Sequence, residues 1–129
     1  MTGCRAFALF LFLAGTAVAA EDKPLTPIEA RKKVGETITV EMTIQSTKDR
    51  LEKRGEIYMD AETDFRDAKN FALVITKAGA ASLKLAGIDN PAEFFKGKKV
   101  RATGTVKEVE KVPRIVIEDA KQIKPVEQK

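Results

Sequence analysis

Lys96-Gly97-Lys98-Lys99-Val100-Arg101-Ala102-Thr103-Gly104-Thr105-Val106 is the stretch of sequence that decides the fold. After the turn residue Gly97, every second residue from Val100 to Val106 is apolar or small, and the residues between them are polar. Because successive side chains of a β-strand point to opposite faces, this pattern predicts a strand with one buried face. Gly104 lies inside that strand, where a missing side chain indicates a bend, a bulge or a close approach of another segment.

The same alternation occurs earlier, where Gly35 is followed by a predicted first strand over about residues 37–46 with Ile38, Val40, Met42 and Ile44 facing inward. A second strand is predicted from Gly55 onward, with Ile57 and Met59 facing inward. Residues 70–76 (NFALVIT) are apolar almost throughout, which favours a third strand covered on both faces. The opening stretch is the fourth strand, and residues 113–118 (PRIVIE) predict a fifth.

Two helices are predicted around these strands. Thr26, Pro27 and Glu29 form the pattern of a capping box with proline at the first helical position, so we expect a helix to Lys33 that ends at Gly35. Residues 78–86 (AGAASLKLA) favour a second helix between the third and fourth strands.

The residues in and after the second predicted helix carry three further predictions. Gly79 is expected to weaken the helix, since glycine is a poor helix former. Asp89-Asn90-Pro91 predicts a turn, and Phe94 with Phe95 is expected to plug one end of the core.

The first twenty residues have the pattern of a secretory signal peptide. Arg5 is followed by an apolar core over residues 6–14, and small residues at 17–20 allow cleavage after Ala19 or Ala20. The apolar run is too short to span a bilayer, and Cys4 precedes it, so a lipoprotein is not expected. We therefore expect residues 21–129 to form a single exported domain, periplasmic or extracellular; the alternative is that residues 1–20 form a buried helix.

Composition after residue 20 excludes most catalytic and metal chemistry. The remaining residues contain no cysteine, histidine or tryptophan, and 22 basic residues against 19 acidic ones give a net charge of +3. Zinc and copper sites, thiol nucleophiles and histidine bases lack their usual residues. We therefore expect a binding protein without enzymatic activity, cofactor or metal.

A charged connection over residues 61–69 contains the one acidic cluster, with Phe65 as its single apolar anchor. Asp60, Glu62 and Asp64 have the alternate spacing of the first ligands of a calcium loop. Phe65 stands where that loop needs glycine, and Phe71 where it needs glutamate. The cluster is therefore not expected to bind a metal.

The order of predicted elements indicates a mainly β fold: a five-stranded Greek-key barrel of the oligonucleotide/oligosaccharide-binding (OB) type, with a short N-terminal helix and a helix between strands three and four. A ubiquitin-like or small ferredoxin-like α+β sheet is the alternative.

Four motifs resemble small exported bacterial OB-fold domains. They are residues 30–35 (ARKKVG) before the first strand, 95–98 (FKGK) before the fourth, 70–75 (NFALVI) and 113–117 (PRIVI). The resemblance covers about residues 27–123. It implies an OB fold and similarity to nucleic-acid-binding modules; some relatives are joined to nucleases, but no nuclease segment is present here.

In an OB barrel the usual ligand surface lies between the loop joining strands one and two and the loop joining strands four and five. These loops are predicted at residues 47–54 and 107–114, and both carry excess positive charge. The candidate ligand-binding residues are Lys48, Arg50, Lys53, Arg54, Tyr58, Lys111 and Arg114. Tyr58 would stack a base or sugar while the cations contact phosphates or carboxylates.

This surface predicts a monomeric module that binds single-stranded nucleic acid or an acidic glycan. One alternative is an envelope module that binds a protein partner through the same surface. Another is that the charged loops only keep a small barrel soluble, since one tyrosine is few for a stacking surface.

Overall fold

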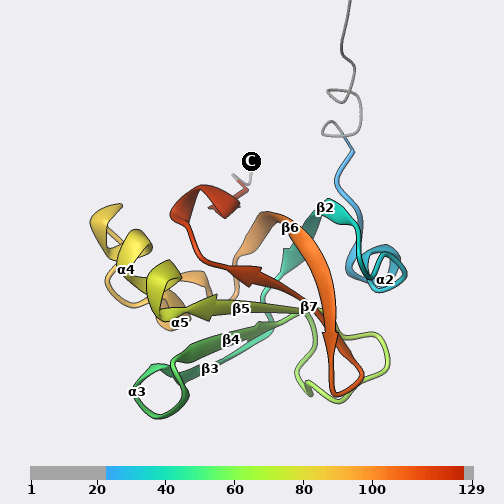
Figure 1. The fold of residues 1–129 in the computed structure, drawn as a ribbon, viewed down its shortest axis with the longest axis horizontal. Coiled ribbons are helices and arrows are strands. Elements are labelled where there is room, and N and C mark those ends of the chain that lie inside the picture. The colour runs from blue at the N-terminus through green and yellow to red at the C-terminus, as the bar shows by residue number, and fades with distance from the viewer. Residues whose placement is uncertain (1–22, 127–129) are drawn as a thin grey trace, which may run out of the picture.

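The computed structural model describes residues 23–126, so the predicted signal peptide lies outside the described residues. Within residues 23–126, seven strands form one sheet, and short helices lie at the ends of strands (Figure 1). The fold is therefore mainly β, as predicted. Among these same residues, no helix is long and apolar enough to cross a membrane.

The strands are β2 (Thr37–Thr43), β3 (Ser46–Arg50), β4 (Glu56–Asp60), β5 (Ala72–Thr76), β6 (Lys99–Val109), β7 (Val112–Ile117) and β8 (Ile123–Pro125). The helices are α2 (Pro27–Ala30), α3 (Leu51–Arg54), α4 (Lys77–Leu85), α5 (Pro91–Phe95) and the 3₁₀ turn η2 (Ala120–Gln122). The strand order is β2-β6-β7-β5-β4-β3, with β8 also paired to β6. The pair β5–β7 is parallel, and the other strand pairs are antiparallel.

The prediction of five strands in a barrel was an undercount, and the sheet is not closed. The predicted first strand divides at Ile44 and Gln45 into β2 and β3, which are the two end strands of the sheet path. The backbone N–H of Ile44 donates to the carbonyl of Lys98 before β6, whereas that of Gln45 donates to the carbonyl of Asp60 in β4. The chain therefore passes from one half of the sheet to the other at this point.

The predicted loop over residues 47–54 was wrong. Residues 46–50 (STKDR) form β3, which pairs with β4, and residues 51–54 form α3. No β3 residue is buried, so a polar sequence is compatible with a strand here. Gly55 adopts a left-handed conformation (φ 75°) and its N–H donates to the carbonyl of Leu51, which turns the chain into β4.

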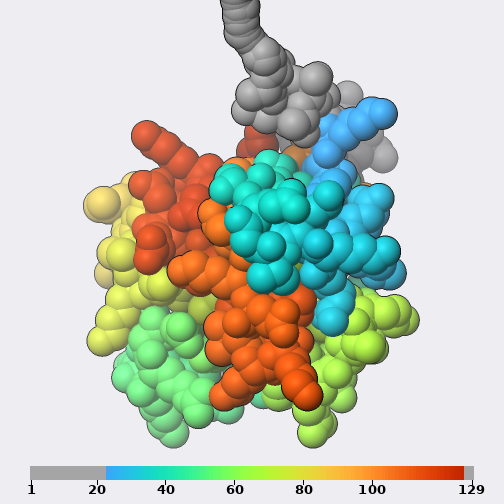
Figure 2. All heavy atoms as spheres, turned by 45° about the vertical axis from the view of Figure 1, so that its right-hand side comes forward, coloured from blue at the N-terminus to red at the C-terminus, as the bar shows by residue number. Residues whose placement is uncertain are grey.

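The opening stretch forms β6, and its alternation is confirmed, because Val100, Ala102 and Val106 are at most 1% exposed. A Cβ added at Gly104 would lie 2.6 Å from Cγ2 of Ile115, so the glycine permits the close approach of β7. The other face of β6 is turned outward beside β2 (Figure 2, orange and cyan).

The side chain of Gln122 hydrogen-bonds to β6 between the part of this strand that pairs with β8 and the part that pairs with β7. This strand pairs with β8 over residues 100–102 and with β7 over residues 106–109. Between them, Nε2 of Gln122 donates to the carbonyls of Thr103 (3.0 Å) and Val116 (2.9 Å). Its Oε1 accepts from the N–H groups of Glu118 (2.7 Å) and Asp119 (3.1 Å). One side chain therefore joins β6, β7 and the turn before η2.

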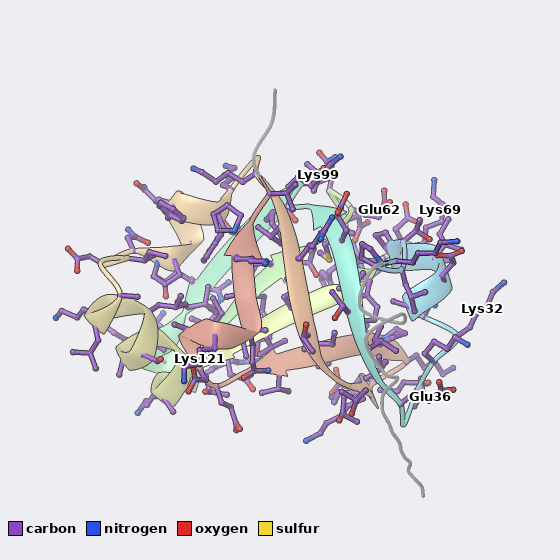
Figure 3. The ribbon with its side chains drawn as sticks, turned by 90° about the horizontal axis from the view of Figure 1, so that it is seen from above. Lys32, Glu36, Glu62, Lys69, Lys99 and Lys121 are labelled. Atoms are coloured by element: carbon purple, nitrogen blue, oxygen red, sulfur yellow. The ribbon has the colours of Figure 1, made fainter. Side chains whose placement is uncertain are left out.

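The predicted capping box is confirmed: Oγ1 of Thr26 accepts from the N–H of Glu29, and the Glu29 carboxylate accepts from the N–H of Thr26. The helix ends at Ala30 rather than Lys33, and Ala30 is its buried residue. Arg31 next donates to the carbonyl of Asn70, and Figure 3 shows Lys32 on the same side of the molecule as Lys69 of the connecting loop.

The helix predicted between strands three and four is α4, but the expected role of Gly79 was wrong. A Cβ at Gly79 would lie 2.1 Å from the carbonyl oxygen of Ile117, so only glycine lets α4 pack against β7. The glycine is therefore a packing requirement and not a weak point of the helix.

The Phe94-Phe95 plug is half confirmed. Phe95 is fully buried, whereas Phe94 is 37% exposed and lies beneath Nζ of Lys98, 4.4 Å from the ring centroid. The predicted turn is the N-terminus of α5, where the side chain of Asn90 accepts from the N–H of Glu93.

Candidate functional site

The outward side chains of β3, β4, β5 and β7 form one surface, which we call the outer face. Inward residues of these strands, such as Ile57, Leu73 and Ile115, belong to the core, so their neighbours along each strand point the other way. The register places these outward residues in two rows: Lys48, Tyr58, Val74 and Val116 in the first, and Ser46, Asp60, Ala72 and Arg114 in the second. The floor of the outer face is apolar, since Ala72 and Val74 are at most 2% exposed.

Tyr58 points outward, as its place in the strand predicted, and it lies opposite Lys48 of β3. Its hydroxyl donates to the carboxylate of Glu56, two residues back on β4. This hydrogen bond, together with burial, raises the pKa of Tyr58, while nearby Arg54 opposes the shift. The ring is therefore tethered along its own strand.

A buried polar network lies at one end of the outer face. Asn70 is fully buried, and its Nδ2 donates to Oδ1 of Asp60 (3.0 Å) and to the carbonyl of Phe65 (3.2 Å). Its Oδ1 accepts from the N–H of Glu62 (3.0 Å). Burial raises the pKa of Asp60, opposed by this hydrogen bond and by the positive charges of Lys48 and Arg114. Asn70 thus fixes the loop between β4 and β5 to the sheet.

Arg114 and Lys48 form no ion pair among the described residues, although their positive charges act on the carboxylate of Asp60. Within residues 23–126, no carboxylate oxygen lies within 4.0 Å of the charged nitrogens of either side chain. Nε of Arg114 is enclosed and has no hydrogen-bond partner among the described residues. Both cations are therefore able to contact a negatively charged ligand.

Phe65 is a residue of this region that the sequence prediction missed as a functional candidate. It was expected to anchor its loop in the core, but it is 47% exposed. Nζ of Lys48 lies 5.6 Å from its ring centroid, and Cζ of Arg66 lies 5.7 Å from it. No local pattern marks this exposure, because it depends on how Asn70 folds the loop.

The structure brings four of the seven predicted site residues onto the outer face: Lys48, Arg50, Tyr58 and Arg114. Arg50 follows Lys48 at the end of β3, opposite Glu56, while Lys53 and Arg54 lie in α3 beyond that end.

Lys111 lies at the other end, at the tip of the β6–β7 hairpin, where it and Glu110 have positive φ values of 70° and 51°. The predicted loop over residues 107–114 was also wrong, because Lys107 pairs with Arg114 and Val109 with Val112, which leaves a turn at Glu110 and Lys111. The helix α3 and this turn lie at opposite ends of the outer face.

The acidic cluster is dispersed among loop contacts. Asp60 bonds to Asn70, Asp64 accepts from the N–H and Nε of Arg66, and Asp67 accepts from the N–H of Lys69. Across residues 23–126, no group of three acidic, histidine or cysteine side chains is placed to hold a metal ion.

Two depressions of about 420 Å³ each adjoin β3. One lies against α5 and is lined by Thr47, Asp49, Asn90, Ala92, Glu93 and Lys96. The other lies at α3 and is lined by Asp49, Arg50, Leu51, Glu52 and Lys53, of which Arg50 and Lys53 are predicted site residues.

Comparisons with known proteins concern the fold. No protein-family model and no curated protein matches the sequence. Among solved structures, the chain is similar to asparaginyl-tRNA synthetase from Pyrococcus horikoshii (TM-score 0.54, 12% identity, 81% of this chain and 23% of that one). It is also similar to aspartyl-tRNA synthetase from Entamoeba histolytica (TM-score 0.52, 15% identity, 87% of this chain and 23% of that one).

A third similar structure is described as OBody AM1L10 bound to hen egg-white lysozyme (TM-score 0.55, 14% identity, 82% of this chain and 95% of that one). The chain spans about a quarter of the length of the two synthetases. The synthetase regions that it matches are OB-folds, and at these identities the likeness shows the fold alone.

Proposed function

We propose that this chain is a small OB-fold binding module for single-stranded nucleic acid or another anionic polymer, which it binds on the outer face. The observation that carries this proposal is the position of Lys48 and Arg114. Both lie on one face, and neither forms an ion pair among the described residues. Lys48 lies opposite Tyr58 and over the exposed ring of Phe65.

The chemistry of the outer face suits an extended ligand. Ala72 and Val74 give a small apolar floor, and the cations flank it rather than converge on one point. Single-strand binders combine a positively charged groove with aromatic side chains on which bases stack. Two of the similar structures are tRNA synthetases by name, which supports nucleic acid over an acidic glycan.

The proposal includes no catalytic step. The chain after residue 20 has no histidine or cysteine, and its buried carboxylate, Asp60, is held by Asn70 rather than paired with a second acid. We therefore propose a module that binds without enzymatic activity.

Titration of the purified protein with a fluorescently labelled single-stranded 15-mer, at low and moderate salt, tests this function. Binding should weaken steeply with salt, because cation contacts to phosphates release counterions. Arg50→Glu and Lys111→Glu, at the two ends of the outer face, should weaken it further. Lys124→Glu, an equal charge change on β8, should not. Absence of binding at low salt would refute the proposal, and tighter binding to an acidic glycan would identify the other ligand class.

We also propose that the chain is exported, on the strength of the pattern in residues 1–20. Expression in a bacterium with an outer membrane, followed by fractionation and N-terminal sequencing, tests this. The expected product lies outside the cytoplasm and begins at residue 20 or 21. A cytoplasmic product that begins at Met1 would contradict export.

A second candidate function is recognition of a protein partner in the cell envelope. It is favoured by the likeness to a chain of similar size whose structure is described as bound to lysozyme. Affinity capture from an envelope extract, with Lys48→Glu as the control bait, distinguishes this function. One protein retained by the unaltered bait and lost from the control would support it, whereas equal capture by both baits would count against it.

A further inference from the structure

We propose that Phe65, rather than Tyr58, is the aromatic platform on which a base of single-stranded nucleic acid stacks, with Lys48 and Arg66 contacting the phosphates on either side. This inference rests on the proposed function and extends its binding surface from the sheet onto the loop between β4 and β5. It assigns roles to Phe65 and Arg66, neither of which the sequence marked as a site residue.

The first observation is the exposure of the ring together with its neighbours. Phe65 is 47% exposed, and the positive groups of Lys48 and Arg66 lie 5.6 and 5.7 Å from its centroid. Both cations lie over the ring, so a base that stacks on it takes their place and each long side chain turns to a neighbouring phosphate. Arg66 is partly engaged by Asp64, with Nε 3.3 Å from Oδ1, which leaves its terminal nitrogens for a ligand.

The second observation is that the loop is held in place before any ligand arrives. Asn70 bonds to the carbonyl of Phe65 and to the N–H of Glu62 from a fully buried position. Oγ of Ser46 donates to the carbonyl of Glu62 (3.0 Å), and Arg31 donates to the carbonyl of Asn70. A fixed exposed ring loses little conformational freedom on binding, which favours affinity.

Tyr58 is the weaker candidate because its contacts are internal. Its hydroxyl is engaged by Glu56, and its ring lies beside buried Val74 as cover for the sheet. We therefore assign Tyr58 a supporting contact at most.

Phe94 provides a matched control for Phe65. It is also a partly exposed phenylalanine (37%) with a cation over its ring, but it lies in α5, outside the outer face. Phe65→Ala should weaken binding of the labelled 15-mer by about 5- to 150-fold, the range of one stacked base. Phe94→Ala should change it less than twofold, and Tyr58→Ala should weaken it less than Phe65→Ala does. Thermal unfolding of each variant separates loss of a contact from loss of the fold.

Fluorescence gives a second readout that does not depend on affinity. Because the chain has no tryptophan, Phe65→Trp and Phe94→Trp each introduce a single indole emitter. Titration with the unlabelled 15-mer should quench the emission of the Phe65→Trp variant, because a base stacks on the indole. The emission of the Phe94→Trp variant should not change, and both variants should bind with an affinity close to that of the unaltered protein.

The outcomes are distinguishable. If the unaltered protein does not bind the 15-mer, the proposed function fails and this inference fails with it. If the unaltered protein binds but Phe65→Ala binds equally well, or the emission of Phe65→Trp is not quenched, the inference alone is overturned. Loss of affinity confined to Tyr58→Ala would instead assign the platform to Tyr58.

Discussion

On the outward surface of β2 and β6, polar side chains face partners on the neighbouring strand: Thr37 bonds with Thr105, Thr39 with Thr103, and Glu41 with Arg101. On the outer face, by contrast, Lys48 faces Tyr58 and Arg114 faces Ala72, so the cations have no opposite partner in the register. The two surfaces belong to one sheet, and both carry lysine and arginine.

The difference shows that position, more than composition, separates a structural surface from a candidate binding surface. Cross-strand pairs of threonine, or of opposite charges, stabilise the strands that carry them. Cations without such a pair add little to stability and remain available to a ligand. Changes on the β2–β6 surface should therefore affect stability, and changes on the outer face should affect binding.

The largest expected effect is a loss of stability when the hydrogen bonds that hold the loop between β4 and β5 are removed. Asn70→Ala removes three hydrogen bonds and leaves the buried carboxylate of Asp60 without its donor, so the free energy of unfolding should fall by about 3 kcal/mol. Urea unfolding followed by circular dichroism measures it. The neighbouring exposed Lys69→Ala should change stability by less than about 0.5 kcal/mol. Equal stabilities of the Asn70→Ala and Lys69→Ala variants would show that Asn70 does not hold the loop.

The second-largest effect on stability is expected where β6 packs closely against β7. Gly104→Ala inserts a methyl group 2.6 Å from Cγ2 of Ile115, which should lower the free energy of unfolding by about 2 kcal/mol. The double variant with Ile115→Ala should cost less than the sum of the single changes, because the clashing group is gone. Strict additivity in the same urea experiment would exclude the proposed contact.

Neutralising one cation on each surface tests the comparison directly. Lys48→Gln should weaken oligonucleotide binding several-fold and reduce the slope of log affinity against log salt by about 1. Arg101→Gln removes the same charge, but it should leave binding unchanged and lower stability by about 0.5 kcal/mol through loss of the Glu41 pair. Identical effects on binding would mean that only net charge matters.

The smallest effect concerns the buried carboxylate. Burial raises the pKa of Asp60, so its ionised form is disfavoured in the folded state, and the residue stabilises the fold more when protonated. Asp60→Asn keeps an acceptor for Asn70 and removes the charge, so it should be slightly more stable than the unaltered protein at pH 7. The difference in the free energy of unfolding between the two proteins should shrink as the pH falls through the folded-state pKa of Asp60 toward the ordinary value of 3.8. A gap that widens on acidification would contradict this assignment.

Much of the framework was predictable because it depends on local pattern. The alternation of β6, the apolar run of β5 and the capping box at Thr26 each carry their signal within a few residues. The strand β3 was missed because no β3 residue is buried, so its sequence shows no apolar alternation. The strand β8 was missed because three residues are too few for a period to be detected.

The candidate site was predictable only in part, for a different reason. Tyr58 was placed on this face because the alternation of β4 can be followed from the sequence, whereas Lys48 was assigned to a loop and not to a strand. Phe65 was not placed there, because its exposure depends on the contacts of Asn70 with Asp60 and Glu62, and these are set by the folded loop. The role of Gln122 between β6 and β7 was invisible for the same reason.

The register of the sheet also sets an order of folding. In the half that carries the outer face, Lys48 and Tyr58 are ten residues apart, whereas Thr37 and Thr105 in the other half are 68 apart. Because closing a long loop is entropically costly, the β3–β4–β5 meander should form early and the β2–β6 pairing late. The chain segment that identifies the fold is therefore expected to be among the last to find its partner. Until residues 99–105 have been synthesised, β2 stays without its principal pairing strand, so its exposed edge is open to pairing with other chains.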